Sequence, residues 1–469
     1  MEQHIPGIVL KDGLTQPVFD YKRCLFEKVY VETPVDTDGD GRLDLIAVYI
    51  RRPLETTQGM RVPAIYVANP YMLECNEDWY VPHDVDRDVS PYPQQHITES
   101  DITFDPSTVS FPQPRYPRAT VGYADTAPTE EIPLDCISDW YSYFNSRGYA
   151  SVFCGGLGTR GSQGFNCCGS PEETAAFKAV IDWLNGRCRA FTNLTDNIEI
   201  RADWCTGKVA MSGKSYLGTM CIAVASTGVE GLETIIPEAA ISNWYDYYRC
   251  NGLNLPAIGW QGDDLDILAK YCFSRAKDPE DYASVREAYA AWLEGIAADE
   301  DRDSGNYSRW WDMRNYLKAA DRFKASVFLV HGLADWNVKP THCVNLFAAM
   351  ECRGIPCKMM LHQGGHIYIH DLQGSRFNEM LHLWLDHWLY GIENGAAERI
   401  PNVLVQSNLD QDLWLASPSF PAVKGYTEPV LMPAQESGRL VDDLSATVYD
   451  RTRDNAAEWL AELVRSEEH

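Results

Sequence analysis

The sequence has no long apolar run, no excess of positive charge and no repeated pair of closely spaced cysteines. No apolar stretch has the roughly 20 residues of a membrane-spanning helix, and the first residues, MEQHIPG, show no secretory signal. The formal net charge of −27 argues against nucleic acid or an anionic membrane as a partner. The 14 cysteines are scattered without a usual zinc spacing, so we expect reduced thiols in a cytoplasmic protein.

The remaining composition is that of a globular protein, with 45% hydrophobic and 23% charged residues. A chain of 469 residues is too long for one ordinary core, which predicts several domains or one large domain with insertions.

Residues 35–44 (VDTDGDGRLD) imitate the first half of a calcium loop, with Asp36, Asp38 and Asp40 at alternate positions. The twelfth position, where such a loop needs a bidentate Glu, is Ala47. Both flanking stretches alternate like strands, so we predict a β-hairpin with the aspartates as turn residues and keep calcium as the weaker alternative.

After this hairpin, short apolar runs alternate with helical patterns. The predicted strands are residues 62–71, a strand beginning in 148–164, then 207–213, 325–332 and 357–365, and the predicted helices are 172–186, 216–227 and 377–391. Such alternation predicts a mostly parallel sheet covered by helices on both faces, with function in the loops beyond the carboxyl ends of the strands.

Ser215 lies between a predicted strand and a predicted helix, in AMSGKSYLGT (210–219). This is the context of a nucleophile elbow, but the usual G-x-S-x-G is altered, because Leu217 stands two residues after the serine and Gly218 follows it. By itself the motif leaves a catalytic serine and an ordinary loop serine about equally favoured.

An acid and a base follow in later loops. Asp335 comes shortly after the strand 325–332, and His362, His366 and His370 follow the next strand at four-residue intervals. That spacing also suits metal ligands on a helix, but Gly364 and Gly365 would break the helix. The order Ser215, Asp335, His366 is the chain order of α/β-hydrolase triads, so we predict the α/β-hydrolase fold.

Several motifs resemble the catalytic domain of the Xaa-Pro dipeptidyl-peptidase family, which is related to cocaine-esterase-type serine hydrolases. They include GKVAMSGKSYLGTM, SNWYDYYRCNG, GDDLDILAKYCFSR, GNYSRWWDMRNYL and LVHGLADWNVKP. The likeness covers about residues 25–395 and implies Ser215 as nucleophile, His366 as general base and Asp335 as the group that orients the histidine.

The resemblance also implies the other site residues. Tyr71 and the amide of Tyr216 would form the oxyanion hole, and Trp244 and Tyr247 would line a proline pocket. Asp263 and Asp264 would bind the substrate's α-ammonium group, although related enzymes have Glu at the first of these positions and the aspartates could instead cap a helix. Asn337 would hold a substrate carbonyl.

The predicted organisation has three parts: an N-terminal extension (1–24), a catalytic domain (25–395) with a helical cap at about 245–325, and a C-terminal segment (396–469) resembling an incomplete β-sandwich. Family members usually carry a larger N-terminal domain and a full C-terminal sandwich, so the oligomeric state cannot be carried over.

The leading functional prediction is a serine exopeptidase that releases Xaa-Pro dipeptides from peptides with a free N-terminus and proline second. The alternatives are an esterase or acylase using the same triad, and an inactive shortened homologue. None of these calls for a metal or an organic cofactor.

Overall fold

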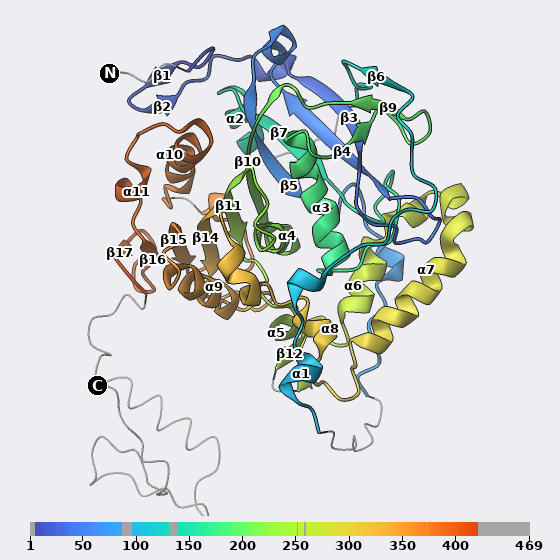
Figure 1. Ribbon diagram of the computed structural model, residues 1–469. Coiled ribbons are helices and arrows are strands. Elements are labelled where there is room, and N and C mark those ends of the chain that lie inside the picture. The colour runs from blue at the N-terminus through green and yellow to red at the C-terminus, as the bar shows by residue number, and fades with distance from the viewer. Residues whose placement is uncertain are drawn as a thin grey trace, which may run out of the picture. The chain divides into compact units, whose positions relative to one another are not determined.

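The computed structural model describes residues 5–86, 96–130, 139–250, 252–257, 259–372 and 374–420, and its main feature is a 13-stranded sheet (Figure 1). In sheet order the strands are β17 (Trp414–Ser417), β16 (Val403–Gln406), β15 (Cys357–His362), β14 (Ser326–Gly332), β11 (Leu232–Glu238), β10 (Cys205–Lys214), β5 (Val62–Ala68), β7 (Ala150–Cys154), β4 (Leu45–Arg52), β3 (Leu25–Glu32), β8 (Ala190–Phe191), β9 (Ile198–Ile200) and β6 (Gly122–Ala124). From β7 to β16 neighbouring strands are parallel.

The α-helices of the described residues are α1 (Glu99–Ile102), α2 (Asp139–Asn145), α3 (Pro171–Leu184), α4 (Tyr216–Ala225), α5 (Trp244–Tyr248), α6 (Leu265–Cys272), α7 (Pro279–Asp299), α8 (Arg309–Asp312), α9 (Thr341–Glu351), α10 (Phe377–Tyr390) and α11 (Ala396–Arg399). Two short hairpins, β1 (Leu10–Lys11) with β2 (Leu14–Thr15) and β12 (Arg249–Cys250) with β13 (Leu253–Asn254), lie outside the main sheet.

Helices cover both faces of the parallel strands, because alternate residues of each strand point to opposite sides. Along β5, Ala64 and Tyr66 belong to a core that includes residues of α3, α4 and α9, whereas Ile65 belongs to a second core with residues of α2 and α10. The central strands are therefore mostly buried along their length, as expected of a sheet covered on both faces. This confirms the predicted α/β architecture.

The predicted hairpin around residues 35–44 is confirmed. Strands β3 and β4 pair antiparallel from Leu25 opposite Arg52 to Glu32 opposite Leu45. Within the connection, the Asp36 Oδ2 atom accepts the Gly41 N–H at 2.9 Å, and Asp38 forms an ion pair with Arg275 at 2.8 Å. The aspartates thus act as turn residues and as a partner for arginine.

The structure differs from the prediction at several strands of the sheet. The strand β11 was not predicted. It lies between β10 and β14, and the carbonyl of its last residue, Glu238, accepts the Ser215 N–H. At the other end of the chain, β16 and β17 extend the main sheet rather than forming a sheet of their own. Residues 421–469 of the predicted C-terminal segment lie outside the described residues, so that division of the chain stays a prediction.

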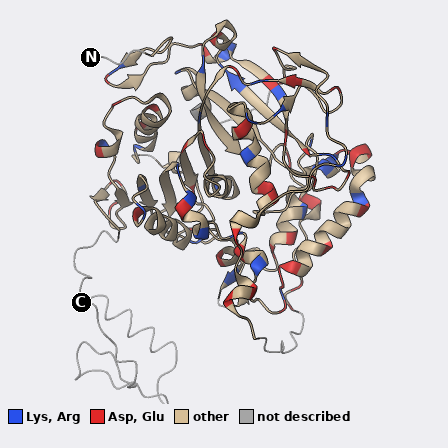
Figure 2. Cartoon of the chain, in the orientation of Figure 1, with Lys and Arg blue, Asp and Glu red and all other residues tan. Residues whose placement is uncertain are grey.

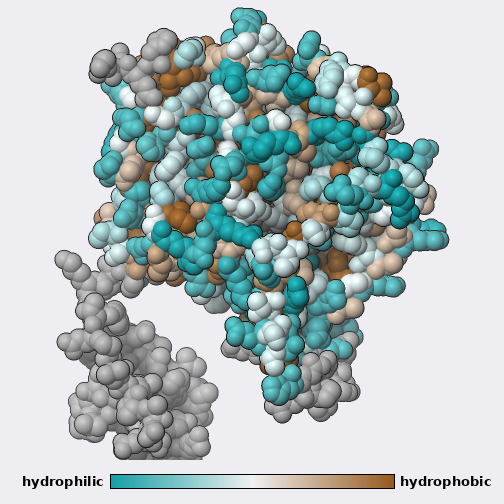
Figure 3. All heavy atoms as spheres, in the orientation of Figure 1, coloured by the Kyte–Doolittle hydropathy of each residue, from teal (hydrophilic) through white to brown (hydrophobic). Residues whose placement is uncertain are grey.

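The region 245–325, predicted to be a helical cap, contains α6 and α7, which pack against each other (Figure 1), followed by α8. Acidic residues are spread over many elements, α7 among them (Figure 2). On the face shown in Figure 3, hydrophobic residues occur in small separate groups. None of the helices in the described part of the chain has the length and apolarity needed to cross a membrane.

Candidate active site

Ser215 occupies a strained turn between β10 and α4. Its φ and ψ angles are 62° and −128°, a region that residues other than glycine rarely adopt. The Ser215 N–H donates to the Glu238 carbonyl of β11 at 2.9 Å, which fixes the turn to the neighbouring strand. The serine stands immediately before the first residue of α4, where helix N–H groups have no partner within the helix.

The altered glycine spacing has a steric explanation. A Cβ atom on Gly213 would lie 2.4 Å from the Leu217 Cβ atom, and one on Gly218 would lie 2.6 Å from the Gly213 carbonyl oxygen. Both glycines therefore allow α4 to approach β10 closely, and Gly218 performs this role one position later than in G-x-S-x-G.

Asp335 and His366 come together although 31 residues separate them. The His366 Nδ1 atom lies 2.8 Å from the Asp335 Oδ2 atom. The other carboxylate oxygen of Asp335 accepts the backbone N–H groups of Asn337 and Val338, each at 2.9 Å. The carboxylate is buried and held at both oxygens, so it can fix the orientation of the imidazole.

Two basic side chains support this pair. His331 lies buried with its Nε2 atom 3.6 Å from the Asp335 Oδ2 atom, and burial lowers the pKa of His331, which favours its neutral form. Lys214, the residue before the serine, donates to the His366 carbonyl oxygen at 3.2 Å. The histidine loop is thus tied directly to the serine turn.

A cavity of about 560 Å³ opens onto these residues. The sequence-predicted site residues that line it are Tyr71, Ser215, Tyr216, Trp244, Tyr247, Asp263, Asn337 and His366. Most of them come together because β5, β10, β11, β14 and β15 are parallel, and their carboxyl ends meet at one edge of the sheet. Asp263 instead comes from the segment just before α6.

The aromatic lining residues form a connected series of edge-to-face contacts. Tyr71 contacts Tyr216 with ring centroids 5.8 Å apart, Tyr216 contacts Trp244 at 5.0 Å, and Trp244 contacts Tyr247 at 6.1 Å. Trp244 is fully buried and its indole N–H donates to the Tyr316 hydroxyl at 3.0 Å, so it is a packed part of the wall. The Tyr247 hydroxyl donates to the Asn337 Oδ1 atom at 2.7 Å.

Asp263 is a buried carboxylate at the cavity, and its Oδ1 atom has no hydrogen-bond partner among the described residues. Burial, together with the neighbouring charge of Asp264, raises the pKa of the Asp263 carboxyl to about 7. Hydrogen bonding by the Tyr248 and Tyr80 side chains offsets part of this rise. A buried carboxylate oxygen that accepts no hydrogen bond is costly, and a cationic ligand group would remove that cost.

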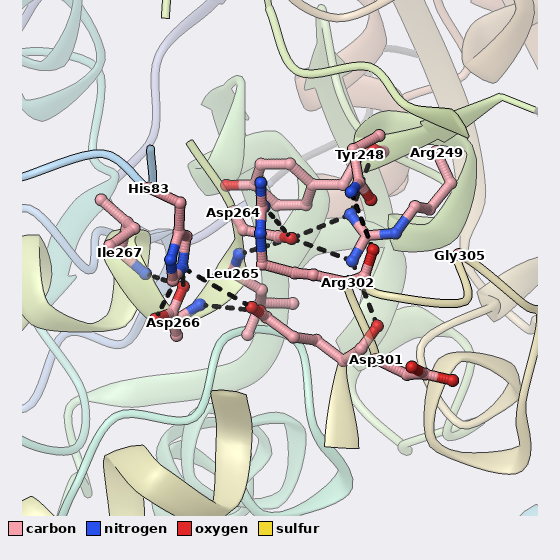
Figure 4. A network of polar contacts seen from close by, with 12 residues as sticks. His83, Tyr248, Arg249, Asp264, Leu265, Asp266, Ile267, Asp301, Arg302 and Gly305 are labelled. Atoms are coloured by element: carbon pink, nitrogen blue, oxygen red, sulfur yellow. Dashed lines mark hydrogen bonds and ion pairs between the residues drawn. The ribbon is translucent and has the colours of Figure 1, made fainter. Parts of the chain in front are cut away.

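Asp264 lies apart from its neighbour. Its side chain accepts the Leu265 N–H at 2.9 Å as the N-cap of α6, and it forms a fully buried ion pair with Arg249 at 2.9 Å (Figure 4). Arg302 contacts the same carboxylate. Asp264 is not among the residues lining the cavity, so the capping alternative describes it and the paired substrate-binding role does not.

Other lining residues were not singled out from the sequence. They are Asn69, Glu77, Tyr80, Lys214, Leu217, Ile241, Tyr248, Trp260, Leu268, Tyr271 and Tyr368. Tyr80 lies in a stretch without periodicity, so no local pattern marks it. Trp260 shortly precedes Asp263, and an aromatic residue so close to a candidate binding acid is a signal that could have been used.

The sheet, the covering helices and the strand-to-helix turn at Ser215 define the α/β-hydrolase fold. The chain belongs to the X-Pro dipeptidyl-peptidase (S15) family, whose sequence pattern matches residues 38–368.

Relatives agree with this membership, and a solved structure shares the fold. The chain is 40% identical over 469 aligned residues to the Xaa-Pro dipeptidyl-peptidase of Pediococcus pentosaceus, covering 97% of this chain and 57% of that protein. It is 43% identical over 428 residues to that of Lacticaseibacillus casei, covering 91% and 53%. The chain thus spans little more than half the length of these relatives. A CocE/NonD family hydrolase from Staphylococcus aureus shares the fold, with a TM-score of 0.50 and 13% identity over 87% of this chain and 63% of that one.

Proposed function

We propose that the protein is a serine dipeptidyl-peptidase that removes Xaa-Pro dipeptides from the N-terminus of peptides. The observation that carries this proposal is one cavity bordered by a strained serine, by a histidine held at 2.8 Å from a buried aspartate, and by a second, unpaired buried carboxylate. The first three groups suit acyl transfer, and the last suits an ammonium group.

In the proposed reaction, the Ser215 hydroxyl attacks the carbonyl carbon of the proline residue while His366 takes the hydroxyl proton. Asp335 keeps the imidazole in the orientation that this transfer needs. The Tyr71 hydroxyl and the Tyr216 N–H are proposed to stabilise the oxyanion. His366 then gives its proton to the leaving amine as the peptide C–N bond breaks. Water attacks the acyl-enzyme while His366 takes a proton from it, and His366 returns that proton to the Ser215 oxygen as the dipeptide leaves.

Substrate recognition is proposed to use both ends of the cavity. The ring of Tyr247 offers flat apolar surface to a proline ring, and the buried ring of Trp244 packs against Tyr247 and supports this wall. Asp263 would bind the free α-ammonium group, and Asn337, whose oxygen accepts from Tyr247, would offer its NH₂ group to a substrate carbonyl. Asp264 is left out of this proposal, because its charge is already neutralised by arginine.

The described cysteines are free thiols, which supports a cytoplasmic location. The proposed partner is therefore a peptide inside the cell with proline in its second position.

The test is hydrolysis of Ala-Pro-p-nitroanilide beside its N-acetylated form and a p-nitrophenyl ester. We expect the free-amine anilide to be cleaved, the acetylated one to be cleaved poorly, and Ser215→Ala to lose at least about a thousandfold in kcat. Circular dichroism would check that the variant is folded.

Each other outcome has a clear meaning. Equal cleavage of both anilides would contradict recognition of the amine. Cleavage of the ester alone would favour an esterase or acylase. A folded wild-type protein without activity on any of the three would favour the inactive homologue.

A further inference from the structure

A second cluster of possible ligands lies outside the candidate active site. His83, Asp266 and Glu300 each present one ligand atom, and these three atoms lie within 4.8 Å of one another. His83 follows η3 (Glu77–Trp79), Asp266 lies in the first turn of α6, and Glu300 caps the C-terminus of α7. Three segments far apart in the sequence therefore converge at this cluster.

The separations suit ligands that share one cation. The His83 Nε2 atom lies 2.9 Å and 3.1 Å from the two carboxylate oxygens of Asp266 (Figure 4) and 3.9 Å from the Glu300 Oε1 atom. Ligand atoms around one tetrahedral Zn²⁺ lie about 3.3 to 3.6 Å apart, because each is about 2.0 to 2.2 Å from the metal. Small shifts would bring all three within reach.

Glu300 is the observation that points to a ligand. Its side chain is fully buried and its Oε1 atom has no hydrogen-bond partner among the described residues, whereas Oε2 accepts the Asp266 N–H at 3.2 Å. A proton on His83 Nε2 reaches the Asp266 oxygens but cannot bond Glu300 across 3.9 Å. A cation between the three side chains would satisfy every one of them.

The charge around the cluster also allows a cation. Asp264 is paired with Arg249 and Arg302 beside it, so the two arginine charges are partly neutralised (Figure 4). Asp266 and Glu300 then supply negative charge at the cluster itself. A cavity of about 700 Å³ is lined by His83 and Arg302, so it borders the cluster at His83.

We propose that His83, Asp266 and Glu300 bind a divalent transition-metal ion of the Zn²⁺ type. One imidazole nitrogen with two carboxylates favours such a metal over Mg²⁺ or Ca²⁺, which prefer oxygen ligands alone. Binding needs His83 with its Nε2 lone pair free and both carboxyls deprotonated, so it releases any proton held there. The sequence shows no sign of this site because the ligands lack any regular spacing.

A cation at this site would fix the position of the segment that carries Asp263. The backbone N–H of His83 donates to the Gly262 carbonyl at 2.7 Å. A Cβ atom on Gly262 would lie only 2.0 Å from the His83 carbonyl oxygen, so the two backbones are in close contact. A cation that fixes His83 to α6 and α7 therefore fixes the residue before Asp263. If the proposed function holds, loss of the metal raises KM for free-amine peptides and leaves kcat nearly unchanged.

The experiment is Zn²⁺ binding by the full chain after chelator treatment, with TCEP as the reductant because dithiol reagents bind zinc. We expect about one Zn²⁺ per chain by calorimetry and mass spectrometry, and a Tm raised by several degrees. His83→Ala and Glu300→Gln should each weaken binding at least about tenfold. Because glutamine has nearly the shape of a protonated glutamic acid, Glu300→Gln should fold.

Controls separate this site from non-specific binding to an acidic protein. Asp40→Asn, which removes a carboxylate from the other acidic cluster, should bind Zn²⁺ like the wild type, and Mg²⁺ should not raise Tm.

The proposal is overturned if the wild type binds no Zn²⁺, if Mg²⁺ stabilises it equally, or if both ligand variants retain full binding. In the first case a proton takes the place of the cation, since burial with Asp264 and Asp266 raises the pKa of Glu300. These readouts do not depend on peptidase activity, so failure here is distinct from failure of the proposed function.

Discussion

At the scale of residues, Asp263 and Asp264 are chain neighbours in opposite surroundings. Asp264 is neutralised by arginine, whereas Asp263 borders the cavity with an unpaired oxygen. The direction of each side chain at the start of α6 decides this difference. Asp264 therefore stabilises the start of α6, whereas Asp263 is proposed to bind the substrate.

Asp263→Asn should remove the rise of kcat/KM with pH for the free-amine anilide. With the Asp263 pKa raised to about 7 by burial and Asp264, its carboxyl becomes ionised as pH rises through 7, and kcat/KM for the free-amine anilide should rise with it. The substrate's α-ammonium group, with a pKa of about 8, imposes a fall at higher pH. The measurement is the ratio of kcat/KM for the anilide to kcat/KM for the ester between pH 5.5 and 9. Taking this ratio cancels any effect of pH on the catalytic triad, because both substrates use the same triad. A ratio with the same pH profile in the variant would contradict the role of Asp263.

Tyr71→Phe should lower kcat about a hundredfold or more, because one oxyanion donor is lost. Tyr271→Phe is the matched control, since Tyr271 lines the same cavity but its hydroxyl donates to Glu77 at 3.0 Å. Steady-state kinetics on the anilide measure both. Equal losses in the two variants would argue against an oxyanion role for Tyr71.

At the scale of elements, the contact between β10 and α4 positions the serine. Gly218→Ala puts a Cβ atom 2.6 Å from the Gly213 carbonyl oxygen, which pushes α4 from the strand. We expect a loss of about 1 to 3 kcal/mol in the free energy of unfolding, with a large fall in kcat.

The control for that change is Gly295→Ala in α7, where a Cβ atom meets nothing within 4 Å. This substitution should stabilise the protein by up to about 1 kcal/mol through helix propensity alone. Urea denaturation measures both variants. If Gly218→Ala is as stable and active as the wild type, close packing at this turn is not required.

At the scale of the whole molecule, stability should decrease as pH rises from 6 to 9. Burial raises the pKa of Asp44 to about 8 and that of Glu173 to about 7, well above their values in the unfolded chain. Their contribution to stability is complete below about pH 4 and is lost as pH rises through 7 and 8. Repulsion within a chain of net charge −27 acts in the same direction.

We therefore expect a higher Tm at pH 6 than at pH 9 by calorimetry. Added NaCl should reduce this difference only in part, because salt screens surface repulsion but hardly affects buried carboxyls. A Tm that is higher at pH 9, or a difference that salt abolishes, would contradict the contribution of the buried acids.

The sequence by itself determined the alternation of strands and helices, the hairpin β3–β4 and the chain order Ser215, Asp335, His366. These features depend on local periodicity and on turn residues, which neighbouring positions reveal. It did not reveal β11, whose importance comes from its place between β10 and β14.

Only the tertiary structure decided which side chains meet. The 2.8 Å contact of Asp335 with His366, the separation of Asp263 from Asp264, and the convergence of His83, Asp266 and Glu300 all depend on packing between distant segments. Spacing along the chain carries no record of such contacts. They follow from how the sheet aligns its strand ends and how α6 and α7 pack beside it.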